Sequence, residues 1–198
     1  MTVAALYTAP RGIYSAWPGV EAWGLPDRDA RDYAGPWPVV AHPPCSRWCQ
    51  LAGLVEARWG HRRGDDGGCF ASALAAVRRW GGVLEHPAFT AAWPAFGLPR
   101  PRGYGVWEAT VRPGEWVLSV NQADFGHPAR KRTWLLYHGA RAPLAVPVPR
   151  AVAPPAVTSF CRNHGSDDRR PRLTKKQASA TPPAFAAWLV ALAEGATD

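Results

Sequence analysis

The chain has 198 residues, enough for one full-sized domain, and 47% of them are hydrophobic. The net charge is +8, and all but three of the 23 basic residues are arginines, whose planar guanidinium suits phosphates and base edges. This bias favours a nucleic-acid partner. The alternative explanation of the arginine excess is a GC-rich genome, which favours arginine codons. No apolar run reaches the roughly eighteen residues of a membrane span, and no signal-like start is present, so we expect a cytoplasmic protein without a membrane partner.

The first 36 residues are rich in glycine and proline and are predicted to be irregular apart from an apolar start at residues 3–7. In chain order, the remaining predicted elements are a strand at 37–41, helices at 46–59 and 69–80, strands at 83–85, 116–120 and 133–137, and a helix at 184–193. The helix at 69–80 is amphipathic and ends at Gly81, whereas Thr181 is the expected N-cap of the last helix.

Residues 37–85 form a strand–helix–strand pattern, which predicts a right-handed crossover between parallel strands. We therefore expect an α/β fold with a truncated, mostly parallel sheet and flanking helices. Residues 1–139 and 172–198 are predicted to form the main domain, and the Pro- and Arg-rich residues 140–171 a small loop-rich insert.

Cys45 and Glu85 leave two of the predicted strands in the same manner. Pro43 and Pro44 stiffen the loop that carries Cys45, and Glu85 ends an apolar run. Since carboxyl ends of parallel strands share one sheet edge, where ligands bind in α/β folds, both side chains are expected there. Alone, Cys45 is open to interpretation as an inert buried thiol, and Glu85 as an ion-pair or helix-cap residue.

Further polar residues accompany the strand ends. His42, His86 and His127 flank the apolar runs, and three histidines at one edge raise the prospect that one moves protons. Asp65 and Asp66 are candidates for an accessory role, although a polar turn is the favoured interpretation. The four cysteines, at positions 45, 49, 69 and 161, have no zinc-site spacing, so no metal is expected.

Three segments in this order resemble motifs of the DNA (cytosine-5) methyltransferase family. Pro43-Pro44-Cys45 resembles the loop of the family's nucleophile, and Leu84-Glu85-His86-Pro87 resembles its Glu-Asn motif with histidine in place of asparagine. The segment from Val120 to Arg132 resembles the block that ends in Gln-x-Arg-x-Arg. The chain is also similar to short phage-encoded proteins described as cytosine methyltransferase-like, which would place it in the cytoplasm of a bacterial host.

The resemblance implies a Rossmann-like methyltransferase sheet and modification of carbon 5 of cytosine in DNA. Cys45 would add to carbon 6 of a flipped cytosine, with a thiol pKa lowered by its place at a helix start. Glu85, protonated or sharing a proton, would contact nitrogen 3, and Arg132, supported by Arg130, would hold the exocyclic oxygen. The substrate-binding residues implied beside them are Pro44, Ser46, His86, Asn121 and His127. Trp48, near the nucleophile, is a candidate for stacking on a base.

The cofactor implied is S-adenosylmethionine, but the chain departs from the family at that site. Residues 6–12 lack the Gly-x-Gly of the cofactor loop, and the glutamines expected in the first and third motifs are Ser46 and Ala129. Arg130 and Arg132 could instead belong to a solvated run of charges. The two-residue alternation of a strand argues against this, because it places both arginines on one face of the strand start.

Three further functions therefore stay open. The same pyrimidine chemistry with a different electrophile or cofactor is one, and a non-catalytic DNA-binding module is another. A thiol hydrolase that uses Cys45 is the third, although no oxyanion motif supports it.

Overall fold

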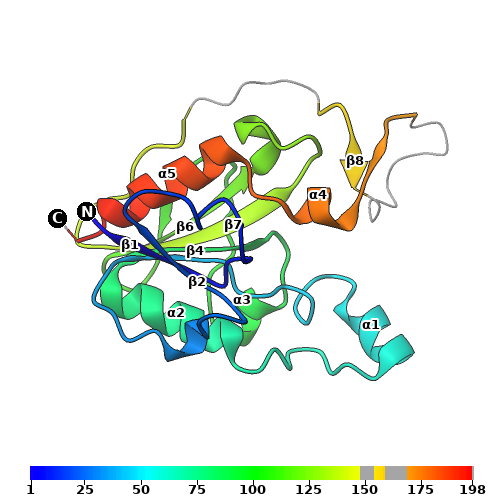
Figure 1. The fold of residues 1–198 in the computed structure, drawn as a ribbon, viewed down its shortest axis with the longest axis horizontal. Helices are drawn as coiled ribbons and strands as arrows, with labels where there is room; N and C mark the ends of the chain where they lie inside the picture. Colours follow the sequence, from blue (N-terminus) through cyan, green and yellow to red (C-terminus); the bar gives the residue numbers. More distant parts are fainter. Residues whose placement is uncertain (148–153, 159–168, 198) are drawn as a thin grey trace.

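A seven-stranded mixed sheet forms the centre of the computed structural model, which describes residues 1–147, 154–158 and 169–197 (Figure 1). The strand order is β2-β1-β3-β4-β7-β6-β5. The strands are β1 (Val3–Leu6), β2 (Val20–Trp23), β3 (Val39–Ala41), β4 (Gly82–Pro87), β5 (Glu108–Ala109), β6 (Glu115–Asn121) and β7 (Arg132–His138). A separate two-stranded sheet pairs β8 (Val157–Thr158) with β9 (Arg172–Leu173).

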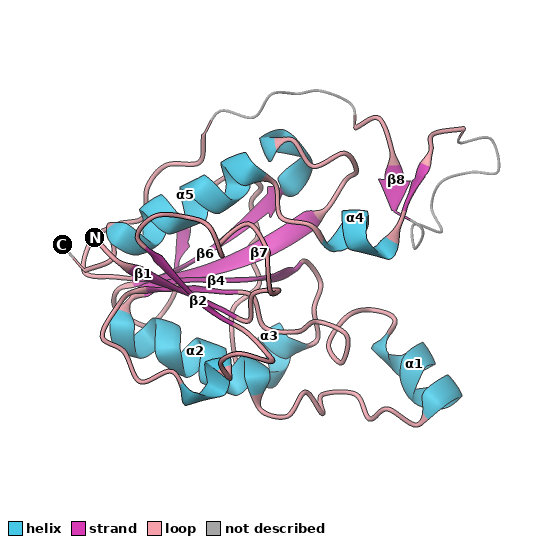
Figure 2. Ribbon diagram, in the orientation of Figure 1, coloured by secondary structure: helices cyan, strands magenta, loops and turns pink. Residues whose placement is uncertain are grey.

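Helices cover both faces of the main sheet (Figure 2). The helices are α1 (Ala52–Trp59), α2 (Cys69–Trp80), α3 (Ala92–Ala95), α4 (Lys175–Ser179) and α5 (Pro183–Glu194), with 3-10 turns η1 (Ala30–Asp32) and η2 (Gln122–Phe125). One face packs against α2 and α3 in a core that includes Leu84 and Trp134. The other face packs against α5 in a core that includes Val83 and Leu135. Because side chains alternate along a strand, each central strand contributes to both cores.

The predicted α/β class is correct, but the sheet is mixed rather than mostly parallel. The pairs β1–β2, β1–β3 and β3–β4 are parallel, and the pairs β4–β7, β6–β7 and β5–β6 are antiparallel. The physical reason is the short link from β6 to β7 through η2, since a parallel pair would need a crossover of a dozen or more residues. As a result β7 lies between β4 and β6.

Several element boundaries also differ from the prediction. Residues 20–23, which we expected to be irregular, form the edge strand β2. The helix expected at 46–59 begins only at Ala52, and the N-cap of α5 is Pro182 instead of Thr181. The small sheet β8–β9 includes residues beyond 171, where the insert was expected to end.

The turn from α2 into β4 depends on glycine. Gly81 caps α2 by donating its N–H to the Val77 carbonyl, and both Gly81 and Gly82 have positive φ. A Cβ at Gly82 would lie 2.0 Å from the Val39 carbonyl oxygen. Glycine therefore lets β4 pair closely with β3, and this pairing fixes the residues that follow both strands.

Candidate active site at the ends of β3 and β4

The carboxyl ends of β3 and β4 lie side by side, as the sequence predicted. The strands pair in parallel with Ala41 opposite Leu84, so the next residues, His42 and Glu85, are also neighbours. His42 Nδ1 and Glu85 Oε2 are 2.9 Å apart, and both side chains are nearly buried, at 13% and 10% exposure. A buried carboxylate thus pairs with an imidazole at the sheet edge where α/β folds bind ligands.

A hydrogen-bond network extends from this pair across the sheet. The Gln122 amide donates to Glu85 Oε1 at 3.2 Å and to Thr133 Oγ1 at 2.9 Å. On the other side, the Tyr14 hydroxyl lies 2.9 Å from His42 Nε2. Tyr14 follows β1, Gln122 opens η2 and Thr133 lies in β7, so separate elements fix Glu85 from both sides. Both carboxylate oxygens of Glu85 thus have a partner, which holds the carboxylate in one position, whereas Gln122 Oε1 is buried without one.

The surroundings keep Glu85 ionised. Burial opposes its charge, but the hydrogen bond from His42 and the positive charges of His42 and Lys131 lower the pKa of Glu85 to about 2. The expectation that Glu85 is itself protonated therefore needs correction, because the nearby positive groups outweigh desolvation. The proton that Glu85 shares is the one held between it and His42.

Cys45 lies within the field of the same charges. Its carbonyl accepts the N–H groups of Trp48 and Cys49, both at 2.9 Å, so Cys45 opens a helical turn as expected. Burial, followed by the negative charge of Glu85, raises the pKa of the half-buried Cys45 thiol, and the Lys131 ammonium opposes this only in part. The predicted lowering of the thiol pKa is thus wrong, since burial and a neighbouring carboxylate dominate over the helix start.

Lys131, instead of Arg130 or Arg132, supplies the cation next to Glu85. Thr133 contacts Gln122 on the Glu85 face, so Lys131 shares that face and the alternate residues Arg132 and Trp134 point to the opposite one. Lys131 Nζ donates to the carbonyls of Ser179 at 3.2 Å and Ala180 at 3.1 Å.

Arg132 therefore lies away from Glu85, in a cavity with Phe89 and Trp134, and Arg130 is exposed. The expected convergence of Cys45, Glu85 and Arg132 is corrected to Cys45, Glu85 and Lys131. The difference is a single-residue shift in register, which exchanges the two faces of a strand.

The remaining predicted site residues divide between the loop and the core. Pro44 and Ser46 flank Cys45 and are exposed, as a substrate-facing loop requires. Asn121 has a positioning role, because its Oδ1 accepts the N–H of Lys131 at 2.9 Å. His127 is buried, and its Nδ1 lies 2.7 Å from the Ala129 carbonyl oxygen, apart from Glu85.

Three other candidates support the fold around the site. Asp66 accepts N–H groups of Gly68 and Phe70 at the start of α2 and the indole N–H of Trp48 at 2.7 Å, whereas Asp65 is exposed. Trp48 is buried against Phe70 and Phe96, so it is not free to stack on a base. The aspartates therefore act as the polar turn that the sequence favoured. Cys161 lies outside the described residues.

His86 points to the face opposite Glu85. Its ring packs edge-on against Phe70 at 5.2 Å and stacks with Trp93 at 6.4 Å, and it is fully buried. Burial lowers the pKa of His86 from 6.5 to about 4, against the opposing charge of Glu85. A substrate contact by His86 would require it to leave this core.

This burial predicts a pH-dependent stability. Between pH 6.5 and about 4 the unfolded chain binds a proton at His86 that the folded chain excludes, so the free energy of unfolding falls as the pH drops. We expect a loss of about 1–2 kcal/mol between pH 7 and pH 5 in urea titrations. A His86→Leu variant should lose this dependence, and His61→Gln, at an exposed position, should retain it. An unchanged slope in His86→Leu would contradict the assignment.

Sequence reasoning missed Tyr14, Gln122 and Lys131. Tyr14 lies in a segment with no periodic pattern, so nothing in the sequence links it to His42. Gln122 and Lys131 are in the third motif, and only the register of β7 shows which of its residues face Glu85. Within the described ranges, no cluster of histidine, cysteine, aspartate or glutamate side chains could hold a metal ion. In the same ranges, no helix is both long and apolar enough to cross a membrane.

No family model, curated protein or solved structure matches this chain. The function is therefore inferred from the side chains at the ends of β3 and β4 and from the motifs that carry them.

Proposed function

We propose that the protein modifies carbon 5 of cytosine in DNA through a covalent bond between Cys45 and carbon 6 of the base. The observation that carries this proposal is the buried pair of His42 and Glu85 at the sheet edge, with Cys45 three residues after His42 and Lys131 on the Glu85 face. A thiol, a carboxylate and an ammonium group are the nucleophile, the ring-nitrogen partner and the anion stabiliser that this chemistry needs.

The addition step uses each of these groups. The Sγ–C6 bond forms as the S–H bond of Cys45 breaks and its proton passes to solvent, and the electron pair of the 5,6 double bond becomes available at carbon 5. Negative charge then builds up at nitrogen 3, where the proton held between His42 and Glu85 can stabilise it. Lys131 would stabilise charge on the exocyclic oxygen, the role first expected of Arg132. After carbon 5 has accepted an electrophile, its own proton passes to a water molecule, the 5,6 double bond is restored and the Sγ–C6 bond breaks.

The sheet supports a Rossmann-like methyltransferase architecture. The chain passes from β1 outward to β2 and then returns to β3 on the other side of β1, which creates a topological switch point between β1 and β3. In such sheets ligands bind outside the carboxyl ends of the strands at this point. Cys45, which follows β3, therefore lies at the edge of the sheet where a cofactor would bind after β1.

S-adenosylmethionine is the cofactor that we propose. A cavity of about 950 Å³ lies along the edge strand β2 and the segment that follows β1, and its wall includes Thr8, Arg11 and Asp27. Its volume suits a ligand of this size, Asp27 offers a carboxylate to ribose hydroxyls, and Arg11 offers a guanidinium to the amino-acid carboxylate. When bound, the cofactor supplies an electrophilic methyl group.

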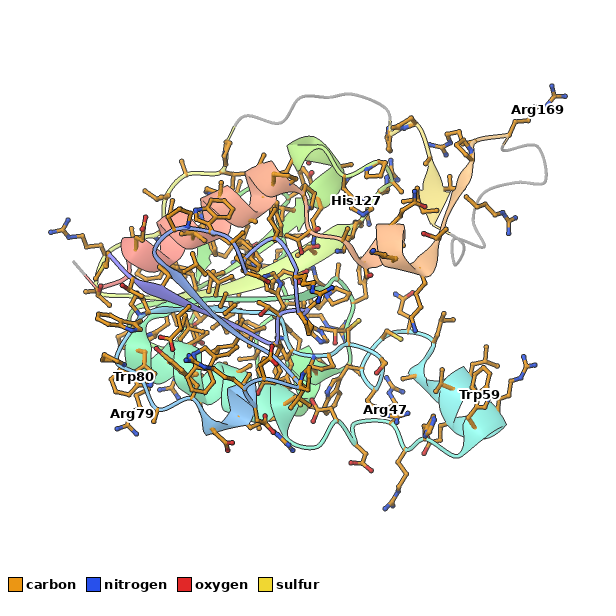
Figure 3. All side chains as sticks on the ribbon, in the orientation of Figure 1. Arg47, Trp59, Arg79, Trp80, His127 and Arg169 are labelled. Atoms are coloured by element: carbon orange, nitrogen blue, oxygen red, sulfur yellow. The ribbon has the colours of Figure 1, made fainter. Side chains whose placement is uncertain are left out.

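DNA as the substrate is supported by exposed basic side chains on two projections at the side of the molecule that carries Cys45. Figure 3 shows Arg47 and Trp59 on the lower arm, residues 46–68 with α1, and Arg169 on the upper arm, formed by β8, β9 and α4. Exposed basic residues of the arms are Arg58, Arg62, Arg63, Arg172, Lys175 and Lys176. Positive charge on both sides of the proposed nucleophile would attract and orient a phosphate backbone.

A mechanism-based trap tests the proposal. In an oligonucleotide that contains 5-fluorocytosine, carbon 5 cannot lose a proton, so a covalent adduct should accumulate in the presence of S-adenosylmethionine. We expect intact-mass spectrometry to show one oligonucleotide bound per chain, and peptide mapping to locate it at Cys45.

The neighbouring cysteine provides the matched control. Cys45→Ala should form no adduct, whereas Cys49→Ala, four residues away on the same turn, should form it as the wild type does. Adduct formation that survives Cys45→Ala would overturn the proposal. DNA binding without any adduct would favour the non-catalytic module, and an adduct that requires another electrophile would replace the cofactor alone.

A further inference from the structure

A second, smaller cavity lies on the sheet face opposite Glu85, at the same edge of the sheet. Its volume is about 230 Å³, and its lining includes Phe89, Tyr104, Ser119, Arg132 and Trp134. Phe89 lies two residues after β4, and Arg132 begins β7, so the cavity is built from the strand ends that also carry Glu85 and Lys131. This volume is below the roughly 300–1,000 Å³ of sites for drug-sized ligands and suits a single planar ring system.

Two partly exposed aromatic rings wall this cavity. Phe89 is 50% exposed and lies over the buried ring of Trp134, with ring centroids 5.3 Å apart. Tyr104 is 52% exposed, and its hydroxyl bonds to Asp124. Phe89 also has a φ of 64°, a left-handed conformation that is unfavourable for a bulky residue. The fold thus holds a large apolar ring in solvent at a conformational cost, which is typical of functional positions.

The charge at the cavity comes from Arg132. Among the described residues Arg132 has no ion-pair partner, whereas Arg102 at the same cavity pairs with Glu108 at 2.9 Å. Asp124 accepts the Tyr104 hydroxyl and forms no ion pair with Arg132. A guanidinium without an ion pair next to an exposed aromatic face combines a site for phosphate with a surface for stacking.

We propose that this cavity binds one unpaired base of single-stranded DNA, stacked on Phe89, with the adjacent phosphate on Arg132. The choice of DNA rests on the proposed function, because the polymer would run from this cavity to the Cys45 loop at the same sheet edge. A base held here keeps the strand separated next to the cytosine that is modified. It also gives Arg132 a role on the face where it lies.

The test compares binding of two oligonucleotides by fluorescence anisotropy, a twelve-residue thymidine strand and a strand with the same phosphates but abasic sugars. Phe89→Asn removes the ring and keeps a residue that tolerates positive φ. We expect it to weaken binding of the thymidine strand about tenfold, since stacking on one aromatic residue has this size, and to leave the abasic strand nearly unchanged. Arg132→Gln should weaken both strands and reduce the slope of log K against log salt by about 0.7.

Matched variants at distant exposed positions are Trp37→Ala and Arg79→Gln, which should bind both strands as the wild type does. Equal weakening of both strands by Phe89→Asn, or no weakening of either, would overturn the proposal. The trap at Cys45 gives an independent readout. Binding that depends on Phe89 without a Cys45 adduct would overturn the catalytic proposal and support this one. A Cys45 adduct together with binding that does not depend on Phe89 would support the catalytic proposal and overturn this one.

Discussion

Glu85→Gln is expected to slow formation of the 5-fluorocytosine adduct about 10²- to 10³-fold, the usual cost of removing one preorganised group that stabilises developing charge. Gln fits the same space but cannot share the His42 proton with nitrogen 3. In the wild type, Glu85 accepts a hydrogen bond from the Gln122 amide and pairs with His42. In the variant, the new glutamine amide at position 85 lies between the same two neighbours. The rate is measured by quenching the reaction at timed intervals and counting adduct by intact mass.

The comparison that makes this result specific is Gln122→Glu, which alters a partner of Glu85 and leaves Glu85 itself in place. A second carboxylate beside Glu85 should raise the pKa of Glu85, because like charges favour protonation. The pH profile of the adduct rate should therefore shift to higher pH. Glu85→Gln should instead lose rate at every pH. An adduct rate that is unchanged in Glu85→Gln would show that Glu85 does not touch the base, and Glu85 would then be the ion-pair residue that the sequence left open.

His42→Ala is expected to lower the free energy of unfolding at pH 7 by about 1–3 kcal/mol, because it leaves a buried carboxylate oxygen without its hydrogen-bond partner. The Glu85 side chain is only 10% exposed, so water cannot replace the imidazole fully. The measurement is urea unfolding followed by tryptophan fluorescence and circular dichroism. The double variant His42→Ala with Glu85→Gln should recover part of the loss, since the unpaired charge is then gone.

The pH dependence separates this explanation from a simple packing defect. In the wild type the pKa of Glu85 is lowered from 4.5 to about 2, so its contribution to stability is present above pH 4.5 and is lost as the pH falls toward 2. Without His42 the carboxylate is buried and less compensated, which raises its pKa, so the difference between variant and wild type should narrow as the pH falls. A difference that is constant with pH would indicate lost packing only.

The sequence by itself determined the elements that surround the candidate site. The helix Cys69–Trp80, the glycine that ends it and the parallel pairing of β3 with β4 follow from apolar periodicity and from the short crossover. For this reason Cys45 and Glu85 could be expected at one sheet edge. The helix and its terminal glycine are local features, and the parallel pairing depends on the single connection between β3 and β4.

Only the tertiary structure decided which side chains share the face of Glu85. Lys131 and Arg132 are adjacent in the chain, and the antiparallel register of β7 directs Lys131 to Glu85 and Arg132 to Phe89. His86 and Glu85 are separated in the same way on β4. The pKa values of Cys45 and Glu85 likewise depend on burial and on the neighbours His42 and Lys131, which long-range packing brings together. A strand alternates its faces with a period of two, so an uncertainty of one residue in register reverses the assignment of every side chain.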